Sequence, residues 1–246
     1  MDILLDPNAH PVIAHRGASL SAPENTMPAF EMAAKAGADA LELDVNLSAD
    51  GVPMVIHDTT LDRTTDLHGP VYSLTAAQLR GADAGARFTA DGGASFPWRA
   101  RGVRIPILGE VLDAFPDMPL AIEIKSARAQ WDVARMLADR GALERCVVSA
   151  FETEAVAAFR EGSFHTGASR RELLSLGIRS LLRLQRDRPR YAAILIPEWY
   201  RGFPLPLRLY IRAARRMGMP LHVWTVNDPG SGLRLWRAGA AGIVTD

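Results

Sequence analysis

The 246-residue sequence predicts an α/β fold: a (β/α)8 TIM barrel with a small insertion after the second strand. Eight short apolar runs recur along the chain, and helix-like segments separate most of them. Hydrophobic residues make up 48% of the chain, which is enough for a large buried core. Short, nearly continuous apolar strands are typical of a parallel sheet covered on both faces. The repeated alternation therefore favours a closed barrel, with an open doubly wound sheet as the main alternative.

The eight apolar runs are the predicted strands. Each has three to six residues, as expected of strands buried in a barrel wall. In chain order they are residues 12–14, 40–45, 120–124, 146–150, 165–168, 192–196, 221–225 and 242–244.

Helices are predicted between most of these strands, at residues 28–38, 109–115, 153–160, 171–185, 207–217 and 232–238. The first has clear start and stop signals, with Pro28 in its first turn and Gly37 near its end. No helix follows the last strand. We expect the N-terminal arm, the preceding helix or a partner subunit to cover it.

Residues 58–104 interrupt the alternation, because they form a long stretch rich in Gly, Thr, Asp and Ala. Long connections in compact domains are usually functional or mobile segments. We interpret this stretch as an excursion between strand two and its helix. The chain is thus predicted to be one domain, residues 1–246, with an insertion at 58–104.

Composition and charge limit the classes of function. The formal net charge is zero, which gives no general attraction for nucleic acid. No apolar run approaches the roughly 18–20 residues that span a bilayer. The N-terminus lacks the basic and apolar regions of a signal peptide, and Cys146 is the only cysteine. These features favour a cytoplasmic protein.

Polar residues fall where the predicted strands end, which is where barrel active sites lie. Side chains two apart on a strand share a face, so Glu42 and Asp44 point together, as do Glu123 and Lys125. The complete set is His15, Arg16, Glu42, Asp44, His57, Glu123, Lys125, His222 and Trp224. Of these, His57 follows a further apolar run, residues 52–56.

This set of residues suits phosphoryl chemistry. Three carboxylates on inward positions of adjacent strands require a compensating charge, and oxygen ligands suit one divalent metal ion, Mg²⁺ or Ca²⁺. No cysteine cluster or H-E-x-x-H pattern indicates zinc. The metal, Arg16 and Lys125 would neutralise a phosphate. One histidine would take a proton from the nucleophile and the other would protonate the leaving alcohol.

The order of the motifs resembles that of the glycerophosphodiester phosphodiesterase family. The matching segments are 12–17, 23–26, 29–30, 37–39, 42–45, 57–58, 61–65, 105–106, 110–112, 123–125, 149–151, 224–227 and 242–246. They span nearly the whole chain, and the first third is the most specific. Residues 160–215 contribute little, and Ala150 stands where the family often has serine.

The resemblance implies a role for each site residue. His15 and His57 would be the acid–base pair, and Glu42, Asp44 and Glu123 would bind the metal. Arg16 and Lys125 would contact phosphate, and Trp224 would line the glycerol side. The family is a (β/α)8 barrel that releases an alcohol and sn-glycerol 3-phosphate. Direct attack by water and a cyclic phosphate intermediate both remain open.

Several interpretations remain open beside this one. A lysophospholipase D acting at a membrane surface is the main alternative activity, and a catalytically silent binding barrel is another. Asp58 either orients His57 or caps a turn, and we favour the turn. His222 is either a supporting residue of the site or a structural one.

Residues 160–216 hold thirteen Arg against four acidic residues, within an apolar and aromatic context. We favour ordinary helices with solvated Arg faces and no membrane contact. The competing interpretation is a basic, amphipathic rim that rests on an anionic membrane and admits lipid-tailed substrates. The oligomeric state is left open.

Overall fold

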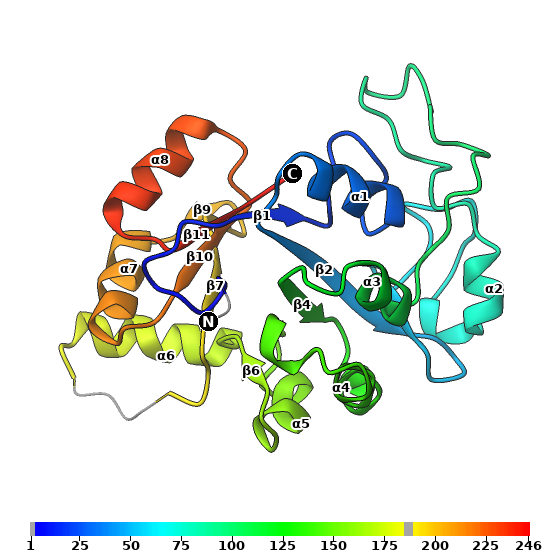
Figure 1. Ribbon diagram of the computed structural model, residues 1–246. Helices are drawn as coiled ribbons and strands as arrows, with labels where there is room; N and C mark the ends of the chain where they lie inside the picture. The colour runs from blue at the N-terminus through cyan, green and yellow to red at the C-terminus, as the bar shows by residue number, and fades with distance from the viewer. Residues whose placement is uncertain (1–2, 185–188) are drawn as a thin grey trace.

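The computed structural model describes residues 3–184 and 189–246, and a curled parallel sheet forms its centre (Figure 1). The eight parallel strands run in the order β6-β5-β4-β2-β1-β11-β10-β7, and β3 pairs with β2 in the antiparallel sense. Each parallel strand overlaps one predicted apolar run. Their bounds are β1 Val12–His15, β2 Ala40–Leu47, β3 Pro53–Val55, β4 Leu120–Ile124, β5 Cys146–Ser149, β6 His165–Thr166, β7 Ile194–Pro197, β10 Leu221–Trp224 and β11 Gly242–Thr245.

The two ends of this strand order approach each other. Gly167, just after β6, forms a parallel bridge with Ala193, just before β7. The backbone N–H of Ala192 donates to Thr166 O at 2.7 Å, and that of Ala168 donates to Ala193 O at 3.0 Å. Backbone hydrogen bonds therefore connect the segment at the end of β6 to the residues that immediately precede β7.

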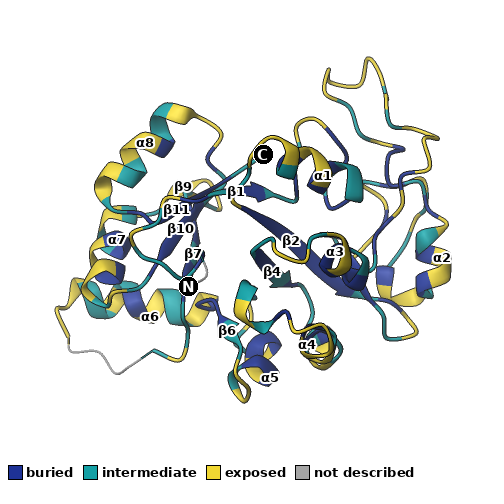
Figure 2. Ribbon diagram, viewed as in Figure 1, coloured by how far each residue is buried: buried dark blue, intermediate teal, exposed yellow. Residues whose placement is uncertain are grey.

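Helices lie outside the curled sheet, and their exposed residues face away from it while the strands are buried (Figure 2). The helix at 130–139 was not among the predicted ones, although Val133, Ala134 and Leu137 are buried at helical spacing. Of the predicted 171–185 helix, residue 185 lies outside the described residues. The bounds are α1 Met27–Lys35, α2 Ala76–Arg80, α3 Leu108–Ala114, α4 Gln130–Asp139, α5 Ala157–Arg160, α6 Arg170–Leu181, α7 Leu207–Arg216 and α8 Pro229–Ala238, with 3-10 turns η1 Val71–Ser73, η2 Ala127–Ala129, η3 Leu143–Arg145 and η4 Thr153–Val156.

The N-terminal arm closes one end of the sheet interior. Leu4 is buried in a cluster with inward-facing residues of five strands and Ala193, namely Ile13, Ala40, Ala121, Val147, Ala193 and Val244. The buried His222 ring donates from Nε2 to Leu4 O at 2.9 Å, which ties the arm to β10. Burial lowers the pKa of His222 to about 4, although the hydrogen bond to Leu4 opposes that shift. His222 is thus a structural residue.

The last strand is covered by both the arm and α8. Ile243 on β11 packs in a cluster with Leu235 and Trp236 of α8. Its backbone N–H also donates to Pro11 O at 3.0 Å. The N-terminal arm and the preceding helix, two of the three elements predicted to cover the last strand, therefore both contact β11.

Residues 58–104 form an excursion that carries η1 and α2 and has its own apolar core. Leu61, Val71 and Leu79 are buried there together with Met54 of β3 and Ile105. A second local feature lies between the predicted strand 192–196 and the predicted helix 207–217: a hairpin of β8 Trp199–Tyr200 and β9 Phe203–Pro204. Among the described residues, no helix is long and apolar enough to cross a membrane.

Candidate active site

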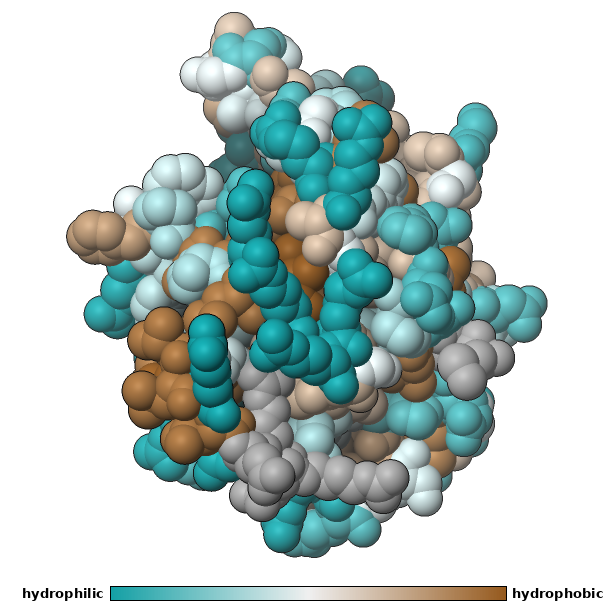
Figure 3. Space-filling view, turned by 90° about the vertical axis from the view of Figure 1, so that its left-hand side faces the viewer, coloured by the Kyte–Doolittle hydropathy of each residue, from teal (hydrophilic) through white to brown (hydrophobic). Residues whose placement is uncertain are grey.

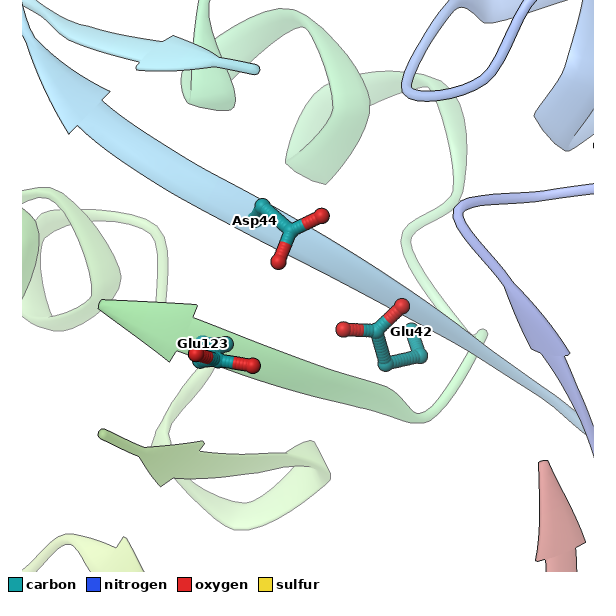
Figure 4. Close-up of side chains that lie close together, drawn as sticks. All are labelled: Glu42, Asp44 and Glu123. Atoms are coloured by element: carbon teal, nitrogen blue, oxygen red, sulfur yellow. The ribbon is translucent and has the colours of Figure 1, made fainter. Parts of the chain in front are cut away.

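Three carboxylates from two neighbouring strands meet at the C-terminal end of the sheet (Figure 4). Glu42 and Asp44 come from β2 and Glu123 from β4, and the strand register pairs Asp44 directly with Glu123. One oxygen of each of the three lies within 4.8 Å of the others. Glu42 and Asp44 are buried, so their charges are poorly screened by solvent.

Two cations compensate part of this negative charge. Lys125 Nζ lies 2.8 Å from Asp44 Oδ1 and 2.7 Å from Glu123 Oε1. Arg16 Nε lies 3.0 Å from Asp44 Oδ2, and the backbone N–H of Arg16 donates to Glu42 Oε2 at 3.0 Å. Three carboxylates thus face two cations, which leaves an excess of one negative charge.

The carboxylates of β2 respond in opposite ways to this environment. Burial raises the pKa of Glu42 well above its ordinary value, and the charges of Asp44 and Glu123 raise it further. Burial also acts to raise the pKa of Asp44, but Lys125 and Arg16 outweigh it, so the pKa of Asp44 is lowered. Glu42 is therefore the carboxylate that most needs a further positive charge in order to ionise.

His15, at the end of β1, is bound to the last residue of the chain. Its Nδ1 lies 2.6 Å from Asp246 Oδ1, and Asn227 Nδ2 donates to the other oxygen at 2.7 Å. Burial acts to raise the pKa of Asp246, but the hydrogen bonds from His15 and Asn227 lower it to about 2. An ionised carboxylate only accepts hydrogen bonds, so Nδ1 of His15 carries the proton.

His57 forms a second pair of the same kind. Its Nδ1 lies 2.6 Å from Asp58 Oδ1, and Arg63 Nε donates to Asp58 Oδ2 at 2.6 Å. Burial acts to raise the pKa of Asp58, but the hydrogen bonds from Arg63 and His57 lower it to about 2. Asp58 thus orients His57, and our preference for a turn-capping role was wrong.

A network of polar side chains holds these pairs in place. Asn46, which shares its strand face with Glu42 and Asp44, donates toward the carbonyls of residues 56–58 at 2.9 to 3.2 Å. Glu24 accepts from Arg16 at 2.9 Å and from both terminal nitrogens of Arg63. Asn25 Nδ2 donates to Asp44 Oδ2 at 2.8 Å.

The turn after His15 requires glycine. Gly17 has φ +81°, and a Cβ there would lie 2.6 Å from the Ala29 backbone carbon. A side chain at this position would therefore push the turn away from α1 and displace His15 and Arg16.

A cavity of about 500 Å³ joins these residues to an apolar wall. His15, His57, Glu42 and Glu123 line one part of it. The rest is formed mainly by apolar and aromatic side chains, including Trp224, whose ring meets that of Phe151 edge-on at 6.1 Å. Ala150 also lies in the wall.

A model of the glycerophosphoryl diester phosphodiesterase family matches residues 15–246. The chain belongs to this family. It is 33% identical over 245 residues to the glycerophosphodiester phosphodiesterase of Caldanaerobacter subterraneus, an alignment that covers 96% of this chain and 93% of that protein. The family and its named members identify the chain as a phosphoric diester hydrolase, a glycerophosphodiester phosphodiesterase.

Solved structures of the family share the fold. The glycerophosphoryl diester phosphodiesterase domain of Mycobacterium tuberculosis Rv2277c is similar with a TM-score of 0.83 at 26% identity, over 96% of each chain. An Oleispira antarctica phosphodiesterase, solved in complex with the product sn-glycerol-3-phosphate, has a TM-score of 0.75 at 24% identity, over 96% of this chain and 93% of that one.

The eight residues to which the resemblance assigns a role all lie at the site of this phosphodiesterase, seven lining the cavity and Asp44 buried against Arg16 and Lys125. His222, the ninth of the predicted set, binds the N-terminal arm instead. Several of the supporting residues lie within the motifs that resemble the family, but the sequence alone assigns them no role; these are Glu24, Asn25, Arg63 and Asp246. Asn46 was not among the predicted residues. The signal was present, because Asn46 continues the every-second-residue pattern of Glu42 and Asp44 on β2.

Proposed function

We propose that this phosphodiesterase hydrolyses glycerophosphodiesters to an alcohol and sn-glycerol 3-phosphate with one divalent metal ion, Mg²⁺ or Ca²⁺. The observation that carries the proposal is one cavity lined by Glu42 and Glu123 together with both carboxylate-bound histidines, His15 and His57. The same product is bound by the Oleispira antarctica neighbour, which supports the choice of product.

Glu42, Asp44 and Glu123 would hold the metal. They fit a hard divalent cation because they offer carboxylate oxygens close together and carry an excess negative charge. The raised pKa of Glu42 reports the same deficit of positive charge. A bound divalent ion would stabilise the negative charge that develops on the phosphate oxygens.

Arg16, Lys125 and Trp224 would bind the substrate. The two cations already lie among the carboxylates, where they can neutralise a phosphate oxygen that approaches from the cavity. The side chain of Trp224 lies in the cavity wall, where it can pack against the glycerol carbons.

His15 and His57 would share the proton transfers. Each uses Nδ1–H to donate to an ionised aspartate, which leaves Nε2 to accept or release a proton. One would take a proton from the nucleophile, either water or the glycerol 2-hydroxyl, and the other would give a proton to the leaving alcohol. The paired aspartate stabilises the imidazolium while the proton is held.

We also propose that the sheet forms a complete (β/α)8 barrel in one domain, residues 1–246, with 58–104 as an insertion. The hydrogen bonds that join Thr166 and Ala168 to residues 192–193 support closure. The relatives are named for glycerophosphodiesters, and we do not favour the lysophospholipase D alternative.

Release of glycerol 3-phosphate from glycerophosphocholine by the purified protein tests this function. We expect release with Mg²⁺ or Ca²⁺ and none with a chelator. Folded protein that releases no product with either metal would contradict the proposal. Release that persists in chelator would contradict the metal dependence alone.

A further inference from the structure

The outer face of α6 is apolar, unlike that of an ordinary surface helix. Leu174, Ile178, Leu181 and the C-cap residue Leu182 recur at helical spacing and are all exposed, Leu181 by 73%. The inner face of the same helix is also apolar, since Leu173 and Leu176 pack in a buried cluster with Tyr210 of α7. The outer residues therefore have no role in the core of the domain, and their exposure requires another explanation.

The β8–β9 hairpin adds two aromatic side chains beside this helix. Trp199 is 59% exposed and Phe203 is 75% exposed. The hairpin adjoins the start of α6, because Tyr200 lines the catalytic cavity together with Arg170 and Leu174 of that helix. We call the six exposed apolar residues of both elements the interfacial face: Leu174, Ile178, Leu181, Leu182, Trp199 and Phe203.

Arginines are exposed on the helix next to α6. Arg208, Arg212 and Arg216 are exposed on α7, which packs against α6. Figure 3 shows this side of the molecule, where an apolar area lies next to long hydrophilic side chains. Residues 160–216 contain thirteen Arg and four acidic residues although the whole chain has no net charge. The segment of the sequence that carries the interfacial face is therefore strongly basic.

The interfacial face is continuous with the mouth of the catalytic cavity. Leu174 belongs to both, and Arg170, Arg171 and Arg201 line the cavity while being exposed to solvent. Whatever binds the interfacial face would lie next to the opening through which the substrate enters.

We propose that the interfacial face docks on the surface of an anionic lipid bilayer. Exposed leucines and aromatic rings bordered by arginines are the combination that inserts into the headgroup region and attracts anionic lipids. A second copy of this chain is a poorer occupant, because a symmetric contact would bring two arginine-rich faces together. This proposal goes beyond hydrolysis and does not depend on it.

Flotation of the purified full chain with vesicles tests the docking. We expect the protein to float with phosphatidylglycerol–phosphatidylcholine vesicles, less at high salt, and not with phosphatidylcholine alone. The double variant Trp199→Ser/Phe203→Ser should lower the bound fraction about tenfold, because it removes two apolar contacts. Trp131→Ser is the matched control: Trp131 is 58% exposed on α4 and should be replaceable without effect.

Charge reversal provides an independent variant. Arg208→Glu/Arg212→Glu should abolish flotation, whereas Arg128→Glu/Arg135→Glu, the same charge change near α4, should leave most of it. Each variant should retain its circular dichroism spectrum. Absence of flotation by the wild type, or equal flotation by both members of a matched pair, would overturn the proposal. So would a wild-type dimer that Trp199→Ser/Phe203→Ser converts to a monomer, since a second copy would then cover this face.

Discussion

At the level of single residues, the two histidines of the site have the same arrangement with different partners. Asp246, from the end of the chain, binds His15, and Asp58, the next residue in sequence, binds His57. The pKa of each aspartate is lowered to about 2, so both remain ionised throughout the neutral range. Each histidine is thereby held in one tautomer and one orientation.

Replacement of either aspartate by asparagine should lower turnover. An amide oxygen still accepts the Nδ1 hydrogen bond, but it does not stabilise the imidazolium, and a flipped amide would favour the other tautomer. We expect kcat for glycerophosphocholine to fall about 10- to 100-fold in Asp246→Asn and in Asp58→Asn, part of the ~10²–10⁴ that a positioned acid or base contributes. Unchanged kcat in both variants would show that the pairs are not catalytic. Asp62→Asn, an exposed carboxylate on His68, is the control and should be neutral.

The sequence predicted the proposed metal-binding and catalytic residues better than the residues that position them. Glu42, Asp44 and Glu123 could be recognised because charged residues are unusual on an apolar strand. The two-residue spacing on a strand also predicts which side chains point to the same face. Partners such as Glu24, Arg63 and Asp246 lie on loops or at a terminus, where no periodicity fixes a direction. Their role follows only from contacts between distant parts of the chain, such as the one joining His15 to Asp246.

At the level of elements, the N-terminal arm is held against the sheet by a histidine that stays neutral. His222 is fully buried, and burial lowers its pKa to about 4 from an ordinary value of 6.5. Below pH 6.5 the unfolded chain takes up a proton at this histidine, whereas the folded chain takes one up only near pH 4. The free energy of unfolding should therefore fall as the pH drops through that window.

His222→Gln should remove this pH dependence. Its amide nitrogen can still donate to Leu4 O, but it does not titrate. Between pH 6.5 and 4 we expect wild type to lose on the order of 3 kcal/mol more stability than the variant, as judged by denaturant unfolding. Equal losses in the two proteins would mean that His222 is not held neutral.

Leu4→Ala tests whether the arm is part of the core. Leu4 is fully buried among inward-facing strand residues, so truncation leaves a cavity. We expect a loss of about 2–5 kcal/mol in the free energy of unfolding. Leu20→Ala is the control, because Leu20 is exposed in the connection between β1 and α1. This variant should lose far less of the free energy of unfolding. A loss below 1 kcal/mol in Leu4→Ala would show that the arm is not packed in solution.

The eight parallel strands were predictable because buried strands leave short, nearly continuous apolar runs. Helix α4 was missed because Trp131 adds an exposed apolar residue to its polar face and blurs the amphipathic pattern. Strands β8 and β9 have two residues each, too few for an alternating pattern to be visible. Local sequence therefore predicts an element only when the element is long enough to repeat.

At the level of the whole molecule, the proposed metal site links catalysis to stability. Glu42 and Asp44 are buried and Glu123 is partly buried, and these three carboxylates face only two cations. A divalent ion would relieve the repulsion among them. A ligand at 100 times its Kd stabilises the folded state by about 2.7 kcal/mol, or roughly 5–10 °C in Tm for a domain of this size. Removal of the metal should lower Tm by that amount.

Glu42→Gln should have opposite effects on the Tm of the metal-free protein and on that of the metal-bound protein. Without metal it removes a buried carboxylate that repels its neighbours, so Tm should rise relative to metal-free wild type. With metal present it lacks a ligand, so the metal-dependent increase in Tm should disappear. Calorimetric scans with and without chelator measure both effects. A metal-dependent increase equal to that of wild type would exclude Glu42 as a ligand.

The most direct test of the central claim is a calorimetric titration of Mg²⁺ and of Ca²⁺ into wild type, Glu42→Ala and His57→Ala, with glycerophosphocholine turnover measured on the same samples. We predict one site per chain in wild type and in His57→Ala, none in Glu42→Ala, and turnover only in wild type. Binding that survives in Glu42→Ala, or normal turnover in His57→Ala, would contradict the assignment of carboxylates to the metal and histidines to the protons.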